Sequence, residues 1–141
     1  MRRPTERGSV LMLMPAGVLV TLLLGAIAFD LSVVFLRQRQ ASALAVDVAN
    51  DLATAALDEA AFRADGTYRI DPARAAELGD VFVGASDLSD EVVAVEVAVR
   101  GLDAVEVRLV LDVEYVFAKA IPGGADGTTV EASATAVAVG P

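Results

Sequence analysis

Residues 9–29 read SVLMLMPAGVLVTLLLGAIAF, a run of 21 residues without a charged side chain, and this stretch decides how the chain is organised. The hydrocarbon core of a bilayer is about 30 Å thick, and roughly 20 apolar residues in helical form cross it. A single segment in lipid can satisfy its own backbone polar groups only by forming a helix. The sequence therefore predicts a membrane-spanning helix near the N-terminus.

Charged residues flank this segment on both sides. Because arginines are more numerous on the N-terminal side, we expect a cytoplasmic N-terminus and an extracytoplasmic C-terminal domain. Asp30 is expected at the membrane interface as a carboxylate that reaches water, with pairing to a neighbouring subunit inside the membrane as the alternative. The arginines are Arg2, Arg3 and Arg7 before the segment and Arg37 and Arg39 after it, the last two expected at the headgroups.

The helix is predicted to continue beyond the membrane. Residues 31–62 contain no Gly or Pro and are rich in good helix formers, so one helix is expected from Ser9 to about Arg63. Small and apolar residues recur in its outer part at three-to-four spacing, which indicates one face that needs a cover. They are Ala41, Leu44, Ala45, Val48, Leu52, Ala55 and Ala56.

The C-terminal half combines a short helix with strands. Asp65 and Gly66 are expected to end the long helix, and Asp71 with Pro72 to start a short one, over 73–78, that Gly79 closes. Alternating apolar residues then predict two strands, with a turn at 101–103 and a loop at 122–127 leading to a third strand, about 128–139. The apolar faces are Val93, Val95, Val97 and Val99, then Val105, Val107, Leu109, Leu111, Val113, Tyr115 and Phe117.

Together these elements predict an α+β fold. A long N-terminal membrane-spanning helix, extended into an amphipathic helix, packs on a small C-terminal antiparallel sheet of about three strands. We divide the chain into a basic leader (1–8), a transmembrane helix (9–36), an amphipathic extension of the same helix (37–63) and an acidic α+β head (64–141).

Composition excludes several classes of function. From Gln40 onward there are 18 acidic residues against 6 basic ones, so nucleic acid is not an expected partner. The absence of Cys and His removes thiol nucleophiles, imidazole bases and most zinc or haem sites, and we expect no cofactor and no metal. Calcium at Asp87, Asp90 and Glu91, or an acid pair among Glu106, Asp112 and Glu114, is less favoured than solvated carboxylates.

The first 60 residues resemble the tight-adherence (TadE/TadG-like) group of type IV pilin-like proteins. The resemblance rests on Arg7-Gly8, the apolar segment, Asp30, the run Arg37–Gln40 and the Ala- and Asp-rich run 41–56. It implies cleavage by a prepilin peptidase between Gly8 and Ser9, although Gly8 can equally be only the small residue before a helix. Pilin-type subunits usually carry Glu at the fifth position after cleavage, and Leu13 stands there instead, which favours an uncleaved anchored accessory.

These observations lead to a hypothesis about function. We expect a non-enzymatic, membrane-anchored minor pseudopilin or accessory subunit of a tight-adherence (Flp/type IV-like) pilus or related secretion assembly. The apolar segment implies membrane lipid as a partner. The resemblance implies a location in the bacterial cytoplasmic membrane or in a pilus, with other pilins, pseudopilins or assembly-platform proteins and a prepilin peptidase as partners. Close helix packing in the membrane is expected at small residues. These are Ala16, Gly17, Gly25, Ala26 and Ala28.

A soluble product is the alternative. Residues 26–28, Ala-Ile-Ala, match the small-residue site of a secretory signal peptide, and cleavage after Ala28 would release a soluble binding domain that starts at Phe29. An enzyme is a third possibility that no residue pattern favours.

Overall fold

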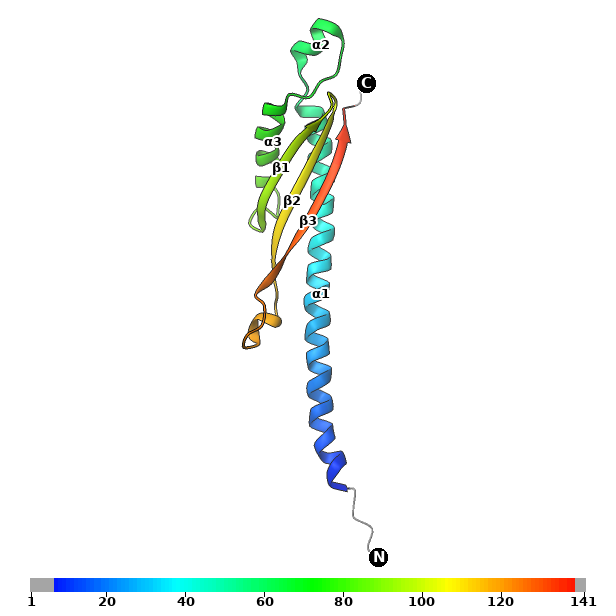
Figure 1. Ribbon diagram of the computed structural model, residues 1–141, viewed down its shortest axis with the longest axis vertical. Coiled ribbons are helices and arrows are strands. Elements are labelled where there is room, and N and C mark those ends of the chain that lie inside the picture. Colours follow the sequence, from blue (N-terminus) through cyan, green and yellow to red (C-terminus); the bar gives the residue numbers. More distant parts are fainter. Residues whose placement is uncertain (1–6, 139–141) are drawn as a thin grey trace, which may run out of the picture.

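The computed structural model describes residues 7–138, and the side chains of residues 13–138. It confirms the expected α+β fold: one long helix packs with its C-terminal half on a three-stranded antiparallel sheet, and its N-terminal half projects alone (Figure 1). The elements are α1 (Arg7–Ala55), α2 (Glu59–Asp65), α3 (Pro72–Gly84), β1 (Val92–Arg100), β2 (Ala104–Glu114), the 3-10 turn η1 (Ala118–Ala120) and β3 (Gly127–Val137).

The expectation of a single helix to Arg63 is wrong, because α1 ends at Ala55. Leu57 leaves the helix to form an isolated antiparallel bridge with Ile70, and the carbonyl of Ala56 accepts a hydrogen bond from the Asp71 amide at 2.8 Å. Asp58 then caps a separate helix, α2, by accepting from the amides of residues 60 and 61. Residues 56–58 are thus drawn out of the helix by partners far along the chain.

The end of α2 and the start of α3 follow the sequence prediction. Gly66 closes α2 with φ +70°, a left-handed conformation that glycine adopts without strain. Asp71 caps α3, and Pro72 occupies its first turn.

The predicted end of α3 at Gly79 is wrong, because the helix continues to Gly84. Gly79 is instead a packing position: a Cβ added there would lie 2.6 Å from Cγ2 of Val97 on β1. Its missing side chain lets α3 lie close against the sheet.

The sheet is antiparallel in the order β1-β2-β3. All of the inward residues of β2 are buried, as the alternation predicted, but β2 ends at Glu114, so Tyr115 and Phe117 do not extend its face. In β1, a break in register between Val92 and Ala94 leaves Val93 61% exposed, which corrects its expected inward orientation.

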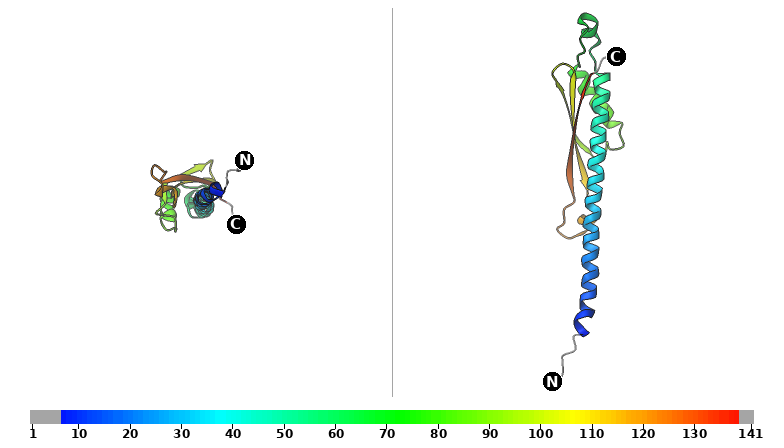
Figure 2. Two further views of the ribbon diagram at one scale, coloured as in Figure 1. Left: turned by 90° about the horizontal axis from the view of Figure 1, so that it is seen from below. Right: turned by 90° about the vertical axis from the view of Figure 1, so that its right-hand side faces the viewer.

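The sheet has one covered face and one open face. Views along and across the helix show α1 and α3 side by side on one face, with the opposite face open (Figure 2). Ala41, Ala45, Val48 and Leu52 of α1 are almost fully buried against it, as the periodicity predicted. The alanines allow the helix and sheet backbones to approach closely, while Leu52 and the valines and leucines of β2 fill the core.

Candidate functional site

Helix α1 consists of two halves with opposite environments. Between Leu13 and Phe29 almost every side chain is exposed although the segment is apolar; Leu22, for example, is 66% exposed and Leu24 is 62% exposed. From Ala41 to Ala56 one face of the chain is covered by the head. By length and composition α1 could cross a membrane, and most side chains of its apolar half are exposed in the described chain.

Asp30 marks the boundary between the two halves. It is the one charged residue that is buried in the described part of the chain, with 5% of its surface exposed. One carboxylate oxygen, Oδ1, accepts hydrogen bonds from the amides of Val116 at 2.8 Å and Phe117 at 3.0 Å, and Oδ2 accepts from the amide of Ala118 at 2.8 Å. Consecutive amides at the start of the 3-10 turn thus form a nest for the carboxylate.

A ring contact strengthens the same junction. The rings of Phe29 and Phe117 pack edge to face with their centroids 5.3 Å apart. The expectation that Asp30 reaches water is therefore wrong: its side chain holds the connection between β2 and β3 against α1. Sequence reasoning missed residues 116–118 because their partner lies 86–88 positions earlier in the chain.

The basic residues after the apolar segment have different surroundings. Arg37 forms a salt bridge to Glu91 at 2.7 Å and hydrogen-bonds the side chain of Gln40, so it is engaged with the head. Gln38 donates to the backbone carbonyl of Glu131 on β3 at 2.6 Å. Arg39 is exposed and remains a candidate for the headgroup contact that was expected of both arginines.

The predicted packing residues lie on two sides of α1. With 3.6 residues per turn, Gly17, Gly25 and Ala28 share one side, on which Thr21 also lies, and this side is opposite Asp30 and the head. A Cβ added at Gly17 or Gly25 would meet nothing within 4 Å. Ala16 and Ala26 instead lie on the side that faces the head further along the helix, about 40° from Asp30. Gly17, Thr21, Gly25 and Ala28 are hereafter called the small-residue face.

The predicted processing site lies at the edge of the described chain. Residues 1–6 of the basic leader are outside the described residues. The backbone of Gly8 and Ser9 belongs to the first turns of α1, and the Ser9 side chain is outside the described part. Cleavage at this bond therefore stays a prediction.

Two of the three acidic side chains considered as an acid pair, Glu106 and Glu114, have cationic partners nearby. Glu106 bonds Arg100 at 2.7 Å, and Glu114 bonds Lys119 at 2.8 Å. The hydrogen bond from Lys119 and its positive charge lower the pKa of Glu114, and the same hydrogen bond and the charge of Glu114 raise the pKa of Lys119. These are interactions on the exposed face of the sheet and in the connection below it.

Asp87, Asp90 and Glu91, which were considered and disfavoured as calcium ligands, do not form a metal-binding group. Glu91 is engaged by Arg37, and within residues 7–138 no group of three acidic side chains is arranged to hold a metal ion.

Comparisons with known proteins add no further assignment: no family model, no curated protein and no solved structure matches this chain.

Proposed function

We propose that the chain is a non-enzymatic, single-pass, membrane-anchored minor pseudopilin or accessory subunit of a tight-adherence pilus or related secretion assembly. One observation carries the proposal: a single helix has an uncovered apolar half of membrane length and a second half that forms the spine of a folded head. Apolar surface on this scale is costly in water but suited to lipid or to the apolar helices of neighbouring subunits.

In the proposed arrangement the N-terminus is cytoplasmic and the head is extracytoplasmic. The small-residue face points away from the head, so a neighbouring transmembrane helix can approach there without a clash with the sheet. The open face of the sheet, which carries many of the acidic side chains, is directed outward. Leu13 in place of Glu favours an anchored accessory over a polymerising subunit, because a freed amino terminus would lack its carboxylate partner inside a filament.

Mass spectrometry of the mature N-terminus in membrane and soluble fractions tests the proposal. We expect a detergent-extractable protein that begins at Met1, Arg2 or Ser9; Ser9 would indicate prepilin processing. Recovery of the intact chain from the aqueous fraction without detergent would contradict membrane anchorage.

Substitution on the small-residue face tests the assembly role. Gly25→Leu fills the side of α1 opposite the head, and we expect it to reduce co-purification with other pilus components. Ala16→Leu is the comparison: Ala16 was also predicted to pack, but it is an exposed position on the other side of the same helix, so the pair of variants separates the two sides. Equal association of both variants would count against packing at this face.

One observation favours the secreted-domain alternative. Phe29 and Asp30, which contact the connection between β2 and β3, come immediately after the potential signal-peptidase site at Ala28. A chain that starts at Phe29 would keep both contacts. A mature N-terminus at Phe29 in the soluble fraction would therefore support this alternative.

A further inference from the structure

The connection between β2 and β3 has a composition unlike the rest of the head. Residues 115–126 form this connection and carry one basic side chain, Lys119, and one acidic side chain, Asp126, at their end, whereas the chain from Gln40 onward has 18 acidic residues. We call residues 115–121 the lower loop. Its apolar side chains are unusually open for a connecting segment: Val116 is 47% exposed, Phe117 44% and Ile121 48%. A connection that faces only water is normally polar.

The lower loop is held beside the apolar half of α1. Its three consecutive amides bind the Asp30 carboxylate, and Phe117 packs on Phe29, so its position along α1 is fixed. Figures 1 and 2 show this segment, in orange, at the end of the head nearest the N-terminus and next to the helix. The exposed apolar surface therefore continues from α1 onto the head.

The position of Asp30 and the lower loop along α1 fits the thickness of a bilayer. Residues 9–29 span about 31 Å as a helix, which matches a hydrocarbon core of about 30 Å. Asp30 and the lower loop then lie at the edge of that core. Beyond Asp30, Leu31, Phe35 and Leu36 are still 55–70% exposed, and they extend about 9 Å further along the helix, through the layer of lipid headgroups.

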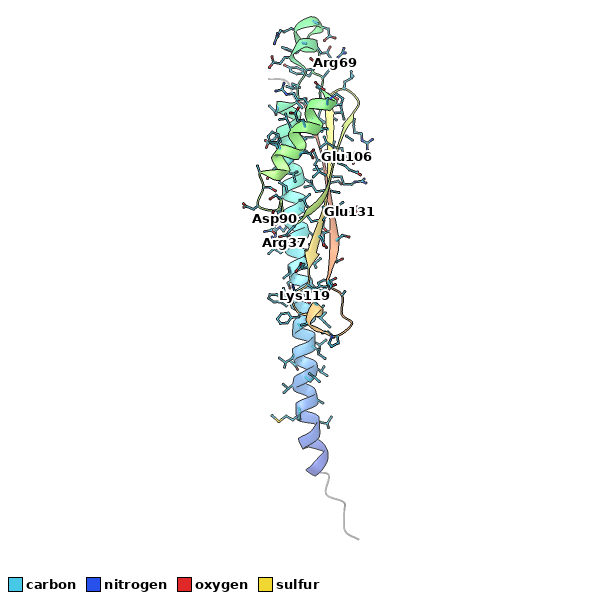
Figure 3. The ribbon with its side chains drawn as sticks, turned by 90° about the vertical axis from the view of Figure 1, so that its left-hand side faces the viewer. Arg37, Arg69, Asp90, Glu106, Lys119 and Glu131 are labelled. Carbon is cyan, nitrogen blue, oxygen red and sulfur yellow. The ribbon has the colours of Figure 1, made fainter. Side chains whose placement is uncertain are left out.

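We propose that the lower loop inserts its apolar side chains into the interfacial layer of the membrane that holds α1, so that the head contacts lipid at a second point. The proposal rests on the membrane anchorage proposed above. We assign lipid as the partner of the lower loop because the exposed apolar side chains of the loop are continuous with the apolar half of α1. Lys119, which Figure 3 shows at the lower end of the head, is paired with Glu114 at 2.8 Å, so the lipid contact rests on the apolar side chains of the loop and not on a net positive charge.

Tryptophan fluorescence tests the contact, because the natural chain contains no Trp. Three single-Trp variants of the full chain are placed in vesicles of phosphatidylcholine and phosphatidylglycerol that carry spin labels either near the headgroup or deep in the acyl chains. Ile121→Trp reports on the lower loop, Leu24→Trp on the apolar half of α1, and Leu102→Trp, at the opposite end of the sheet and 57% exposed, is the matched control. Val116→Trp replaces Ile121→Trp if that variant does not fold.

We expect shallow labels to quench Ile121→Trp most strongly, deep labels to quench Leu24→Trp, and neither to quench Leu102→Trp. If Leu24→Trp is quenched while Ile121→Trp behaves like Leu102→Trp, the anchorage stands and the lipid contact of the loop is wrong. If Leu24→Trp is not quenched, the anchorage itself fails and the inference with it. If the Trp of Ile121→Trp is protected from a water-soluble quencher only at a high ratio of protein to lipid, the loop contacts another copy of the protein, and the proposal is overturned.

Discussion

Replacement of Leu52 by alanine tests the division of α1 into a structural half and an uncovered half. Leu52 lies on the face of α1 that packs against the sheet, and its side chain is fully buried, with 0% of its surface exposed. A buried Leu→Ala change costs about 2–5 kcal/mol, through lost burial and the cavity that remains. Each 1 kcal/mol moves the melting temperature of a domain of roughly 60–100 residues by about 4–8 °C, so a loss of about 3 kcal/mol lowers it by roughly 12–24 °C.

Leu24→Ala is the matched control. It is the same substitution in the same helix, so the small change in helix propensity is common to both variants. Leu24 is 62% exposed, and we expect its effect on the stability of the head to stay within about 0.5 kcal/mol. Thermal unfolding in detergent micelles, followed by near-ultraviolet circular dichroism of the two tyrosines, measures both. Equal shifts for Leu24→Ala and Leu52→Ala would refute the reasoning.

Three further outcomes follow from the contacts described above. Asp30→Asn removes the charge that holds three amides, and we expect those amides to exchange hydrogen markedly faster in the full chain. Gly79→Ala places a methyl group against Val97 and should destabilise the head by about 1–2 kcal/mol, since overpacking outweighs the gain in helix propensity. In the double variant Gly79→Ala/Val97→Ala, the loss of stability should be smaller than the sum of the losses in the two single variants. Hydrogen bonds from Thr67 lower the pKa of Asp65. The ionised Asp65 therefore stabilises the folded protein at neutral pH, and this stabilisation is lost as the pH falls through the lowered pKa. An NMR titration of the Asp65 carboxyl should give a midpoint below 3.8.

Each of these outcomes has a contrary result. Asp112→Asn, a change to an exposed carboxylate on the open face of the sheet, is the control for Asp30→Asn, and equal exchange in the two variants would remove the anchoring role of Asp30. Strictly additive costs for Gly79→Ala and Val97→Ala would show that the two positions are not in contact. A titration midpoint of Asp65 above 3.8 would mean that the hydrogen bonds from Thr67 do not persist in solution.

Periodicity predicted the parts of the fold in which each residue's environment repeats along the chain. Alternation over 105–113 placed Val107 and Leu109 in the core of the sheet, and helical spacing placed Ala45 and Leu52 on the buried side of α1. Both patterns involve residues that are close together in the sequence, so they can be recognised from a single sequence. The cap at Asp71 and the glycine at Gly66 were predictable for the same reason.

The features that escaped prediction depend on partners distant in sequence. Ala56, Leu57 and Asp58 could continue a helix, and they leave it because Ile70 and its neighbours return to pair with them. Gly79 is compatible with a helix end, and only the approach of Val97 shows why a glycine is needed inside α3.

The same limitation applies to Asp30. A carboxylate at the end of an apolar segment is compatible with a water-exposed position, and its burial follows from the return of the chain at residues 116–118. The apolar character of the lower loop was the available signal, because Tyr, Val, Phe and Ile occur there within seven residues, whereas Gly, Pro, Asn, Asp and Ser are the usual turn residues.

The unbroken course of α1 through Asp30 has a mechanical consequence. From Asp30 to Ala55 the helix extends about 39 Å, and the head is attached along that length. If the apolar half is tilted by about 20°, a common value for membrane helices, the far end of the head swings sideways by about 13 Å. In the proposed anchorage, a thinner bilayer, which favours a larger tilt, would bring the head down toward the lipid surface and a thicker one would raise it, so bilayer thickness would set how far the head reaches.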